Sequence, residues 1–174
     1  MKRFILGSLM VSFFIAQPSF AAKGDKLSEV QQVIEFNGLK KDKIYNGSRQ
    51  WVATKFRSAQ NVIQMDDKEN GIIIGKGNFN YPCSGWQCLS YDGHTVQFTV
   101  KIEAKDNKAR ITFNDLVHHI PSKLNAGIIS PQYDFPVEQS TKYDNVTPVK
   151  LKFDEIIQDY KNSVLSTSTS NDNW

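Results

Sequence analysis

This sequence has few histidines and cysteines, and no large excess of charge of either sign. Its 174 residues include three histidines, two cysteines, 21 basic and 18 acidic residues. Two cysteines are too few for a small domain held together by disulfides, and a hydrophobic content of 40% excludes a wholly disordered or collagen-like chain. The length and composition instead indicate one globular domain.

Long hydrophobic runs are also absent, apart from one near the start. Phe4–Ala16 is almost free of polar residues and follows two basic residues, and the small residues Ser19 and Ala21 suit cleavage after Ala21 or Ala22. This order is typical of a secretory signal peptide. As a helix the run spans about 20 Å, which is short of the roughly 30 Å hydrocarbon core of a bilayer. An uncleaved, buried N-terminal helix is the alternative.

We therefore expect residues 1–21 to be a signal peptide and residues 22–27 a short linker. The mature chain would be periplasmic or secreted, with no stable membrane span after cleavage. Loss of Lys2 and Arg3 from the 21 basic residues leaves 19 against 18 acidic residues, a net charge of +1. Such a chain has no basic stripe to hold many phosphates, so we expect no nucleic-acid partner.

The two cysteines, Cys83 and Cys88, are separated by four residues. An exported chain meets an oxidising compartment, so we predict a disulfide between them. Closing so short a loop contributes roughly 2 kcal/mol in the chain-entropy model, so the bond would shape a local loop more than it holds the fold. A redox role prefers a Cys-x-x-Cys spacing, and a zinc site needs two further ligands. These two roles are the alternatives to a structural disulfide, and we expect no metal and no cofactor.

Hydrophobic periodicity predicts the secondary structure. The clearest strand is 94–104, in which apolar and polar residues alternate strictly. Two glycines inside another predicted strand, Gly75 and Gly77, indicate a bulge or the close approach of another backbone. The predicted strands are 28–36, 61–66, 72–81, 94–104 and 109–120, and the predicted helices cover 39–56 and the stripe of Phe153, Ile156, Ile157, Tyr160 and Val164.

These elements predict an α+β fold with an antiparallel sheet of about five strands and two helices packed on one face. The order is strand, helix, four strands, helix, in a single domain over residues 28–165. Residues 121–145 contain prolines and no periodicity, which predicts a loop packed through Tyr133 and Phe135. Residues 166–174 are polar and are expected to be a disordered tail.

Three segments resemble a bacterial exported family of unknown function described as having a TATA-binding-protein-like (TBP-like) fold. They are the helix motif Ile44–Val52, the hairpin Ile63–Gly77 and the alternating strand Val96–Glu103. The resemblance covers residues 28–116, and the hairpin is its most specific part. It implies the same fold, transfers no catalytic residues, and does not imply DNA binding, because function lies in sites rather than in folds.

The histidines offer little support for catalysis. His118 and His119 are adjacent, so on a strand they would point to opposite faces, and at a strand end we expect them on the surface. Ser90, Asp92 and His94 share the residue types of a catalytic triad, but a turn is the simpler explanation for them. We therefore predict no catalytic residue and no metal ligand.

Two groups of residues suit binding. Aromatic residues bracket the disulfide loop, where they would either contact a partner or fold back onto the core. The polar face of the predicted sheet supplies threonine, lysine and arginine. The candidate binding residues are Tyr81, Trp86, Tyr91, Thr99, Lys101 and Arg110.

The sequence therefore favours an exported, non-enzymatic binding or interaction module that recognises a protein or another envelope ligand. The alternatives are a hydrolase-type enzyme with a histidine-based site, and a structural component of the envelope.

Overall fold

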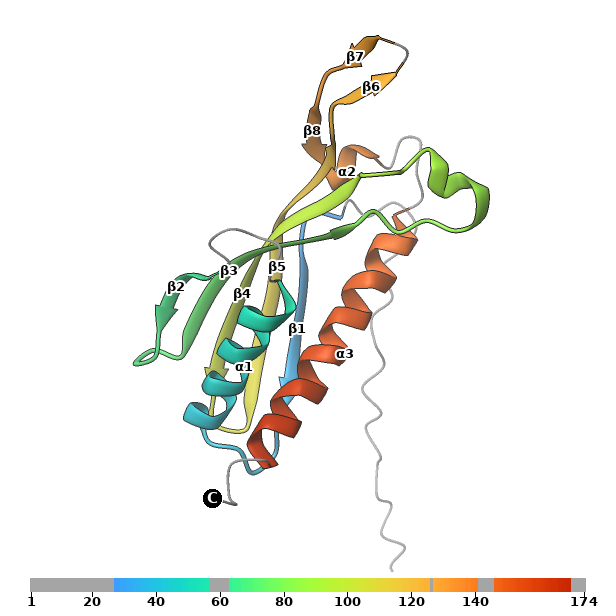
Figure 1. Ribbon diagram of the computed structural model, residues 1–174. Coiled ribbons are helices and arrows are strands. Elements are labelled where there is room, and N and C mark those ends of the chain that lie inside the picture. Colours follow the sequence, from blue (N-terminus) through green and yellow to red (C-terminus); the bar gives the residue numbers. More distant parts are fainter. Residues whose placement is uncertain (1–26, 57–62, 126, 141–145, 170–174) are drawn as a thin grey trace, which may run out of the picture.

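The computed structural model describes residues 27–56, 63–125, 127–140 and 146–169. An antiparallel sheet forms one layer, and the two long helices α1 and α3 form a second layer on one of its faces (Figure 1). Neither long helix lies on the other face, which we call the open face. The fold is thus the α+β arrangement that the periodicity predicts, and the prediction of two helices on one face is confirmed.

The sheet has the spatial order β1-β5-β4-β3-β2, and β8 pairs with the end of β5. A second, two-stranded sheet of β6 and β7 projects beyond that end (Figure 1). The strands are β1 Val30–Glu35, β2 Ile63–Asp67, β3 Ile72–Asn80, β4 Thr95–Lys105, β5 Lys108–Ile120, β6 Lys123–Asn125, β7 Ile128–Ser130 and β8 Tyr133–Pro136. The helices are α1 Lys41–Lys55, the 3-10 turn η1 Gly85–Leu89, α2 Val137–Ser140 and α3 Thr147–Thr169.

The core lies between the sheet and the two long helices. In β4 every second residue from Val96 to Ala104 is buried, because successive side chains of a strand point to opposite faces. The helices contribute the apolar stripes that their spacing predicts. The largest fully buried side chains are Trp51, Tyr160, Phe36, Phe113 and Phe153.

A buried hydrogen bond joins α1 to α3. The Ser48 hydroxyl donates to the carbonyl oxygen of Ile44 at 2.7 Å, and its Oγ lies 2.8 Å from Tyr160 Oη. A serine hydroxyl has one hydrogen, so Tyr160 is the donor to Ser48. Burial raises the pKa of Tyr160, which keeps this hydroxyl protonated and able to donate.

A polar cluster attaches α1 to the edge strand β2. The Tyr45 hydroxyl donates to Asp66 Oδ1, and Arg49 Nε donates to Asp66 Oδ2 at 2.6 Å. Hydrogen bonds from Tyr45 and Arg49 lower the pKa of Asp66. Burial, together with the hydrogen bond to the Asp66 carboxylate, raises the pKa of Tyr45 to about 12.

One of the two glycines in β3 is required by packing. A Cβ at Gly77 would lie 2.8 Å from ring atoms of both Phe56 and Phe98. Real Cβ atoms do not approach other atoms so closely, so only glycine leaves room for these rings. The sequence correctly indicates a close approach here, but aromatic side chains make it rather than another backbone.

A bulge in β5 changes which residues face the core. The register against β4 shifts between Gln97 and Thr99, and Asp115 has a positive φ of 52°. An extra residue in one strand reverses the alternation beyond it. Phe113 before the bulge and His118 after it therefore both point toward the helices, and both are buried.

The predicted strands and long helices are present. Most of their ends shift by at most a few residues, but α3 begins at Thr147, six residues before the predicted stripe. The predicted loop over 121–145 is wrong in its described part, which contains β6, β7, β8 and α2. Tyr133 is 56% exposed and does not pack into the core, whereas Phe135 lies 4.9 Å from the His118 ring. The predicted tail begins too early, because residues 166–169 form the last turn of α3.

The predicted signal peptide and all but the last residue of the linker lie outside the described residues. Within the described part of the chain, none of the helices combines the length and the apolar character needed to cross a bilayer.

Candidate functional site

The predicted sheet residues Thr99, Lys101 and Arg110 all lie on the open face. Their strand neighbours Val100 and Ile111 are buried under the helices, so alternation turns the three predicted residues the other way. Thr99 and Lys101 are partly buried and Arg110 is exposed. The structure therefore places these three residues together on one uncovered surface.

A charge network orders the centre of this face. Arg110 donates to Glu103 Oε2 through Nε at 2.7 Å and Nη2 at 2.6 Å, and Lys101 Nζ lies 3.3 Å from Glu103 Oε1. Burial alone would raise the pKa of Glu103, but the hydrogen bonds from Arg110 and Lys101 outweigh it and lower the pKa below its ordinary value. Glu103 therefore stays ionised and holds both cations in fixed positions.

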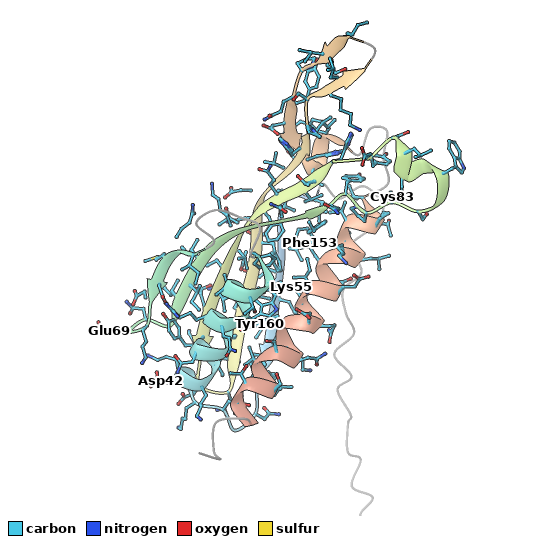
Figure 2. All side chains as sticks on the ribbon, viewed as in Figure 1. Asp42, Lys55, Glu69, Cys83, Phe153 and Tyr160 are labelled. Carbon is cyan, nitrogen blue, oxygen red and sulfur yellow. A yellow bond between two sulfur atoms is a disulfide. The ribbon has the colours of Figure 1, made fainter. Side chains whose placement is uncertain are left out.

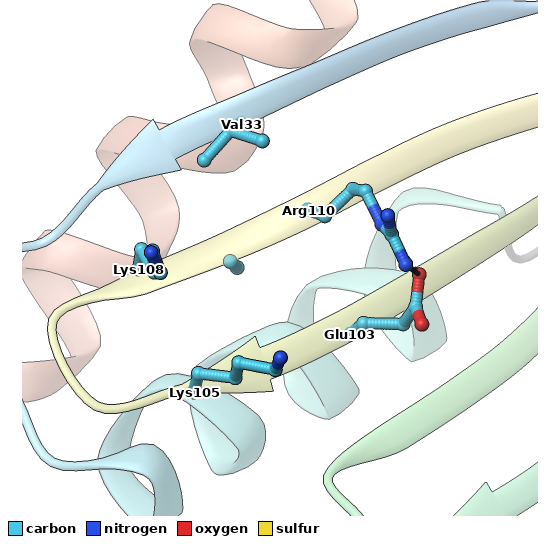
Figure 3. A pocket seen from close by; sticks show the side chains of 6 residues that line it. Val33, Glu103, Lys105, Lys108 and Arg110 are labelled. Atoms are coloured by element: carbon cyan, nitrogen blue, oxygen red, sulfur yellow. Dashed lines mark hydrogen bonds and ion pairs between the residues drawn. The ribbon is translucent and has the colours of Figure 1, made fainter.

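A shallow cavity of about 210 Å³ adjoins this network (Figure 3). It lies over β1, β5 and β4, near the turn that joins β4 to β5. The wall is apolar at Val33 and Ala109 and cationic at Lys105 and Lys108. The strand pairing sets these two lysines directly opposite each other, an arrangement in which like charges repel unless an anion lies between them.

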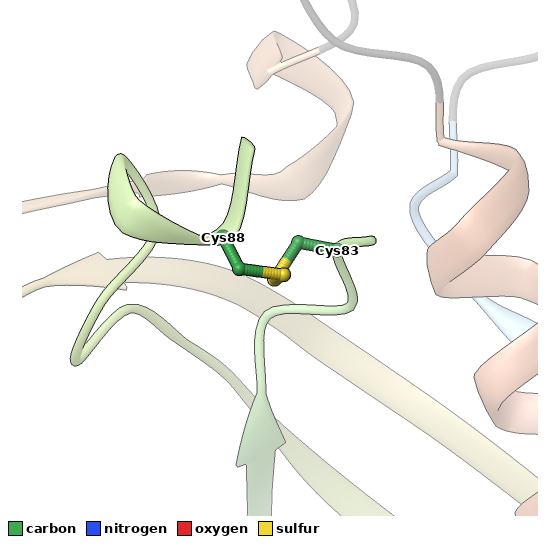
Figure 4. Close-up of a disulfide and its surroundings, with 2 residues drawn as sticks. All are labelled: Cys83 and Cys88. Carbon is green, nitrogen blue, oxygen red and sulfur yellow. A yellow bond between two sulfur atoms is a disulfide. The ribbon is translucent and has the colours of Figure 1, made fainter. Parts of the chain in front are cut away.

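The disulfide loop lies at the other end of the sheet. Cys83 and Cys88 are bonded, as predicted, and the bond closes the short turn η1 (Figure 4). This loop joins β3 to the start of β4, whereas the cavity adjoins the end of β4. Ten residues of extended chain separate those ends by about 33 Å. In Figure 2 Cys83 and Glu69, which follows β2, mark the two ends.

The three aromatic residues of the loop have different roles. Tyr81 is 6% exposed and stacks between Tyr91 and His118, at centroid distances of 4.7 Å and 4.3 Å. Tyr81 thus folds back onto the core, which argues against a contact role, and Tyr91 is half-buried against it. Trp86 is 81% exposed. The open face and the loop therefore do not form one continuous site.

The histidines are placed differently from the prediction. His118 and His119 do point to opposite faces, but His118 is 2% exposed rather than on the surface. Its Nε2 lies 3.1 Å from His94 Nδ1. Within the part of the chain that the structure describes, no group of three or more metal-binding side chains is assembled. Asp92 Oδ2 lies 3.7 Å from Lys123 Nζ.

One histidine does meet a carboxylate that the sequence analysis did not identify. His119 Nδ1 lies 2.6 Å from Asp134 Oδ1. The hydrogen bonds from His119 and Gln132 lower the pKa of Asp134. Asp134 belongs to β8, in the segment predicted to be a loop, so the sequence contained no signal for this pairing.

Residues 31–119 match the model of a family described as a domain of unknown function (DUF4468) with a TBP-like fold. The match covers just over half of the chain. The protein belongs to the DUF4468 family. This confirms the resemblance found in the helix motif, the hairpin and the alternating strand. No curated protein matches the chain in sequence.

Two solved structures have the same fold as this DUF4468 protein. A TBP-like protein from Parabacteroides distasonis ATCC 8503 superposes with a TM-score of 0.57 at 12% identity, over 79% of this chain and 92% of that one. A DUF4468 family protein from Bacteroides ovatus ATCC 8483 has a TM-score of 0.53 at 15% identity, over 84% and 88%. At these identities the likeness shows the fold alone.

Proposed function

We propose that this DUF4468 protein is an exported, non-enzymatic binding module, and that its ligand surface is the open face around Lys101 and Arg110. The observation that supports this most directly is an ordered charge network, fixed by Glu103, on the sheet face that points away from both α1 and α3. Fixed cations bind at a lower entropic cost than mobile ones. The disulfide and the signal-peptide pattern support export.

The charge of the open face indicates an acidic ligand. The strands β1, β2, β3, β4 and β5 turn five cations and four carboxylates toward it, including Asp115, which lines a hollow on this face with Lys76 and Thr99. Glu103 is already neutralised by its two cationic neighbours. A carboxylate-rich ligand would therefore gain most where Lys105 and Lys108 lie opposite each other. The cations are Lys76, Lys101, Lys105, Lys108 and Arg110, and the carboxylates are Glu35, Asp67, Glu103 and Asp115.

A titration with poly-glutamate, followed by NMR chemical shifts, tests this proposal. We expect shifts on the open-face residues of β4 and β5, and loss of binding in the Lys105→Glu/Lys108→Glu variant. These lysines suit charge reversal better than Lys101 or Arg110, because reversing either partner of Glu103 would also disturb the network.

The matched control is Lys43→Glu/Lys161→Glu. Both residues are exposed on the helices and the change in net charge is the same. If both double variants lose binding equally, the effect is one of net charge and the open face is not the site. Absence of shifts on β4 and β5 in the native protein would also exclude this surface.

A hydrolase-type enzyme is the second candidate, and the His119–Asp134 pair is the observation that favours it. In a catalytic triad a carboxylate orients a histidine, which then acts as the base for a nucleophile. Asp134 and His119 supply the first two of these groups. A screen with generic ester and amide substrates tests this candidate, with His119→Ala and His94→Ala compared side by side. Activity that disappears only in His119→Ala would support it, and equal activity in both variants would remove these histidines from consideration.

A further inference from the structure

Exposed large hydrophobic side chains gather at one end of the molecule. Ten such residues are exposed in the described chain, and six of them lie in η1 and in the segment from β6 to β8. We use the name apolar tips for the five that project furthest along these two loops. They are Trp86 and Leu89 on η1, each 81% exposed, and Leu124, Ile128 and Ile129 on the β6–β7 hairpin, at 70%, 73% and 71%.

The strand pairing brings the two loops to the same end. Asn80 at the end of β3 pairs with Thr95 at the start of β4, and Thr95 pairs with His119 near the end of β5. The disulfide loop and the β6–β7 hairpin therefore leave the sheet from neighbouring strand ends, and in Figure 1 the hairpin extends to the top and the disulfide loop to the upper right.

The bases of the two loops are in contact. Lys123 Nζ lies 3.7 Å from Asp92 Oδ2, and a Cβ at Gly93 would be 3.1 Å from the Pro121 ring. Each loop is also braced internally, by the Cys83–Cys88 bond in one and by the pairing of β6 with β7 in the other. The two loops that carry the apolar tips are therefore ordered in the free protein.

Charge is scarce around the apolar tips. Only three of the 30 residues in 81–94 and 121–136 are charged, against 22% of the whole chain. All three are engaged, since Lys123 lies against Asp92 and Asp134 against His119. An apolar surface with so few charges matches a partner that is itself apolar.

We propose that the apolar tips dock this protein on a lipid bilayer by inserting into its interfacial region. Two projecting loops that carry tryptophan, leucine and isoleucine have the composition of interfacial membrane anchors, with Trp86 suited to the headgroup level and the aliphatic side chains to the acyl boundary. A flat protein surface would bury only part of the apolar side chains on two projecting loops, whereas lipids can surround the side chains of each loop. This surface is distinct from the open face, so the inference does not depend on the proposed binding function.

The pairing of Lys123 with Asp92 also predicts how docking depends on salt concentration. Because Lys123 is the only lysine or arginine within residues 81–94 and 121–136 and lies against Asp92, attraction to anionic headgroups contributes little. Docking on zwitterionic vesicles should then be insensitive to salt. The open face predicts the contrary behaviour, since a basic surface would bind anionic vesicles and release them as salt rises.

Flotation of the mature protein with phosphatidylcholine vesicles tests the proposal. We expect binding that is unchanged between low and high salt, and a drop in partitioning of about tenfold or more in Ile128→Ser/Ile129→Ser, because each truncation removes several buried methylene equivalents. Trp86→Ser should weaken binding as an independent second variant. The matched control is Leu151→Ser, which is 57% exposed on α3 and should bind like the native protein.

Tryptophan fluorescence gives a second readout in a Trp174→Phe background. Brominated phosphatidylcholine should quench Trp86 but leave the buried Trp51, which is 2% exposed, unaffected. Several outcomes overturn the proposal: no flotation, equal loss in Leu151→Ser, or binding only to anionic vesicles at low salt. A concentration-dependent dimer that Ile128→Ser/Ile129→Ser dissolves without lipid would also overturn it and assign the apolar tips to a second copy of the chain.

Discussion

The buried hydrogen bond between Ser48 and Tyr160 joins α1 to α3. Comparing Ser48→Ala with Tyr160→Phe tests how much this bond contributes to the free energy of unfolding. The structure predicts unequal effects for its two partners. In Tyr160→Phe, Ser48 keeps its bond to the Ile44 carbonyl, so only one hydrogen bond is lost. The expected decrease in the free energy of unfolding is about 0.5–1.5 kcal/mol.

In Ser48→Ala, by contrast, the Tyr160 hydroxyl stays buried without its acceptor. Leaving a buried polar group unsatisfied costs about 1–3 kcal/mol, from which the better helix propensity of alanine recovers about 0.5 kcal/mol. The sharper prediction concerns the double variant. Adding Tyr160→Phe to Ser48→Ala removes the orphaned hydroxyl, so the double variant should be at least as stable as Ser48→Ala alone.

Urea unfolding followed by far-ultraviolet circular dichroism, with the disulfide intact, measures these differences. The coupling free energy between the two substitutions should be about 1 kcal/mol or more, since the residues share one hydrogen bond. Additive losses, with the double variant less stable than Ser48→Ala by the full effect of Tyr160→Phe, would refute a stabilising hydrogen bond between Ser48 and Tyr160. A changed denaturant slope would show that the comparison no longer reports on one folded state.

Three further predictions concern packing, pH and the disulfide. Gly77→Ala should lower the free energy of unfolding by about 1–3 kcal/mol through overpacking, and Phe98→Leu should relieve part of that loss in a double-mutant cycle measured by urea unfolding. Hydrogen bonds from Tyr45 and Arg49 lower the pKa of Asp66, which implies a stabilisation that is present above its unfolded pKa, near 3.9, and lost as pH falls through the folded value. Asp66→Asn should therefore flatten the acid limb of the stability curve, and equal acid limbs in both proteins would contradict this role of the Asp66 carboxylate. Reducing the disulfide should cost about 2 kcal/mol and leave the far-ultraviolet spectrum intact, and global unfolding would show that the loop holds more of the fold than its length predicts.

Much of the sheet could be predicted from the sequence because its strands are half-buried. Residues 94–104 alternate strictly, since one face meets the helices and the other meets water, and β4 is observed at Thr95–Lys105. The helical spacing of buried residues such as Phe153 and Tyr160 likewise predicts α3. Periodicity therefore located the elements that build the core.

Alternation failed where the chain departs from regular pairing. The bulge in β5 reverses the faces after Asn114, so His118 turns inward although its parity matches the outward Arg110. No residue pattern marked that reversal. The three-residue strands β6 and β7 are too short to show a period, and their exposed side chains give no inward face to detect.

The candidate site was predictable in part for the same reasons. Thr99, Lys101 and Arg110 follow from alternation, and the structure brings them together. Their binding role stays a prediction. The place of Lys105 and Lys108 across the β4–β5 turn depends on register, and the pairing of His119 with Asp134 depends on a strand that the sequence did not indicate.

The position of β1 beside β5 has a consequence for the time order of folding. Val30 pairs with Phe113, so the first strand to leave the ribosome has no sheet neighbour until β5 has emerged. The β3–β4–β5 meander needs only local contacts and can form early, whereas β1 must close a long loop to join it. The N-terminal part of the chain thus stays open during most of synthesis. The complete sheet, which would be too wide for a narrow translocation channel, therefore cannot form before about two thirds of the chain has been made.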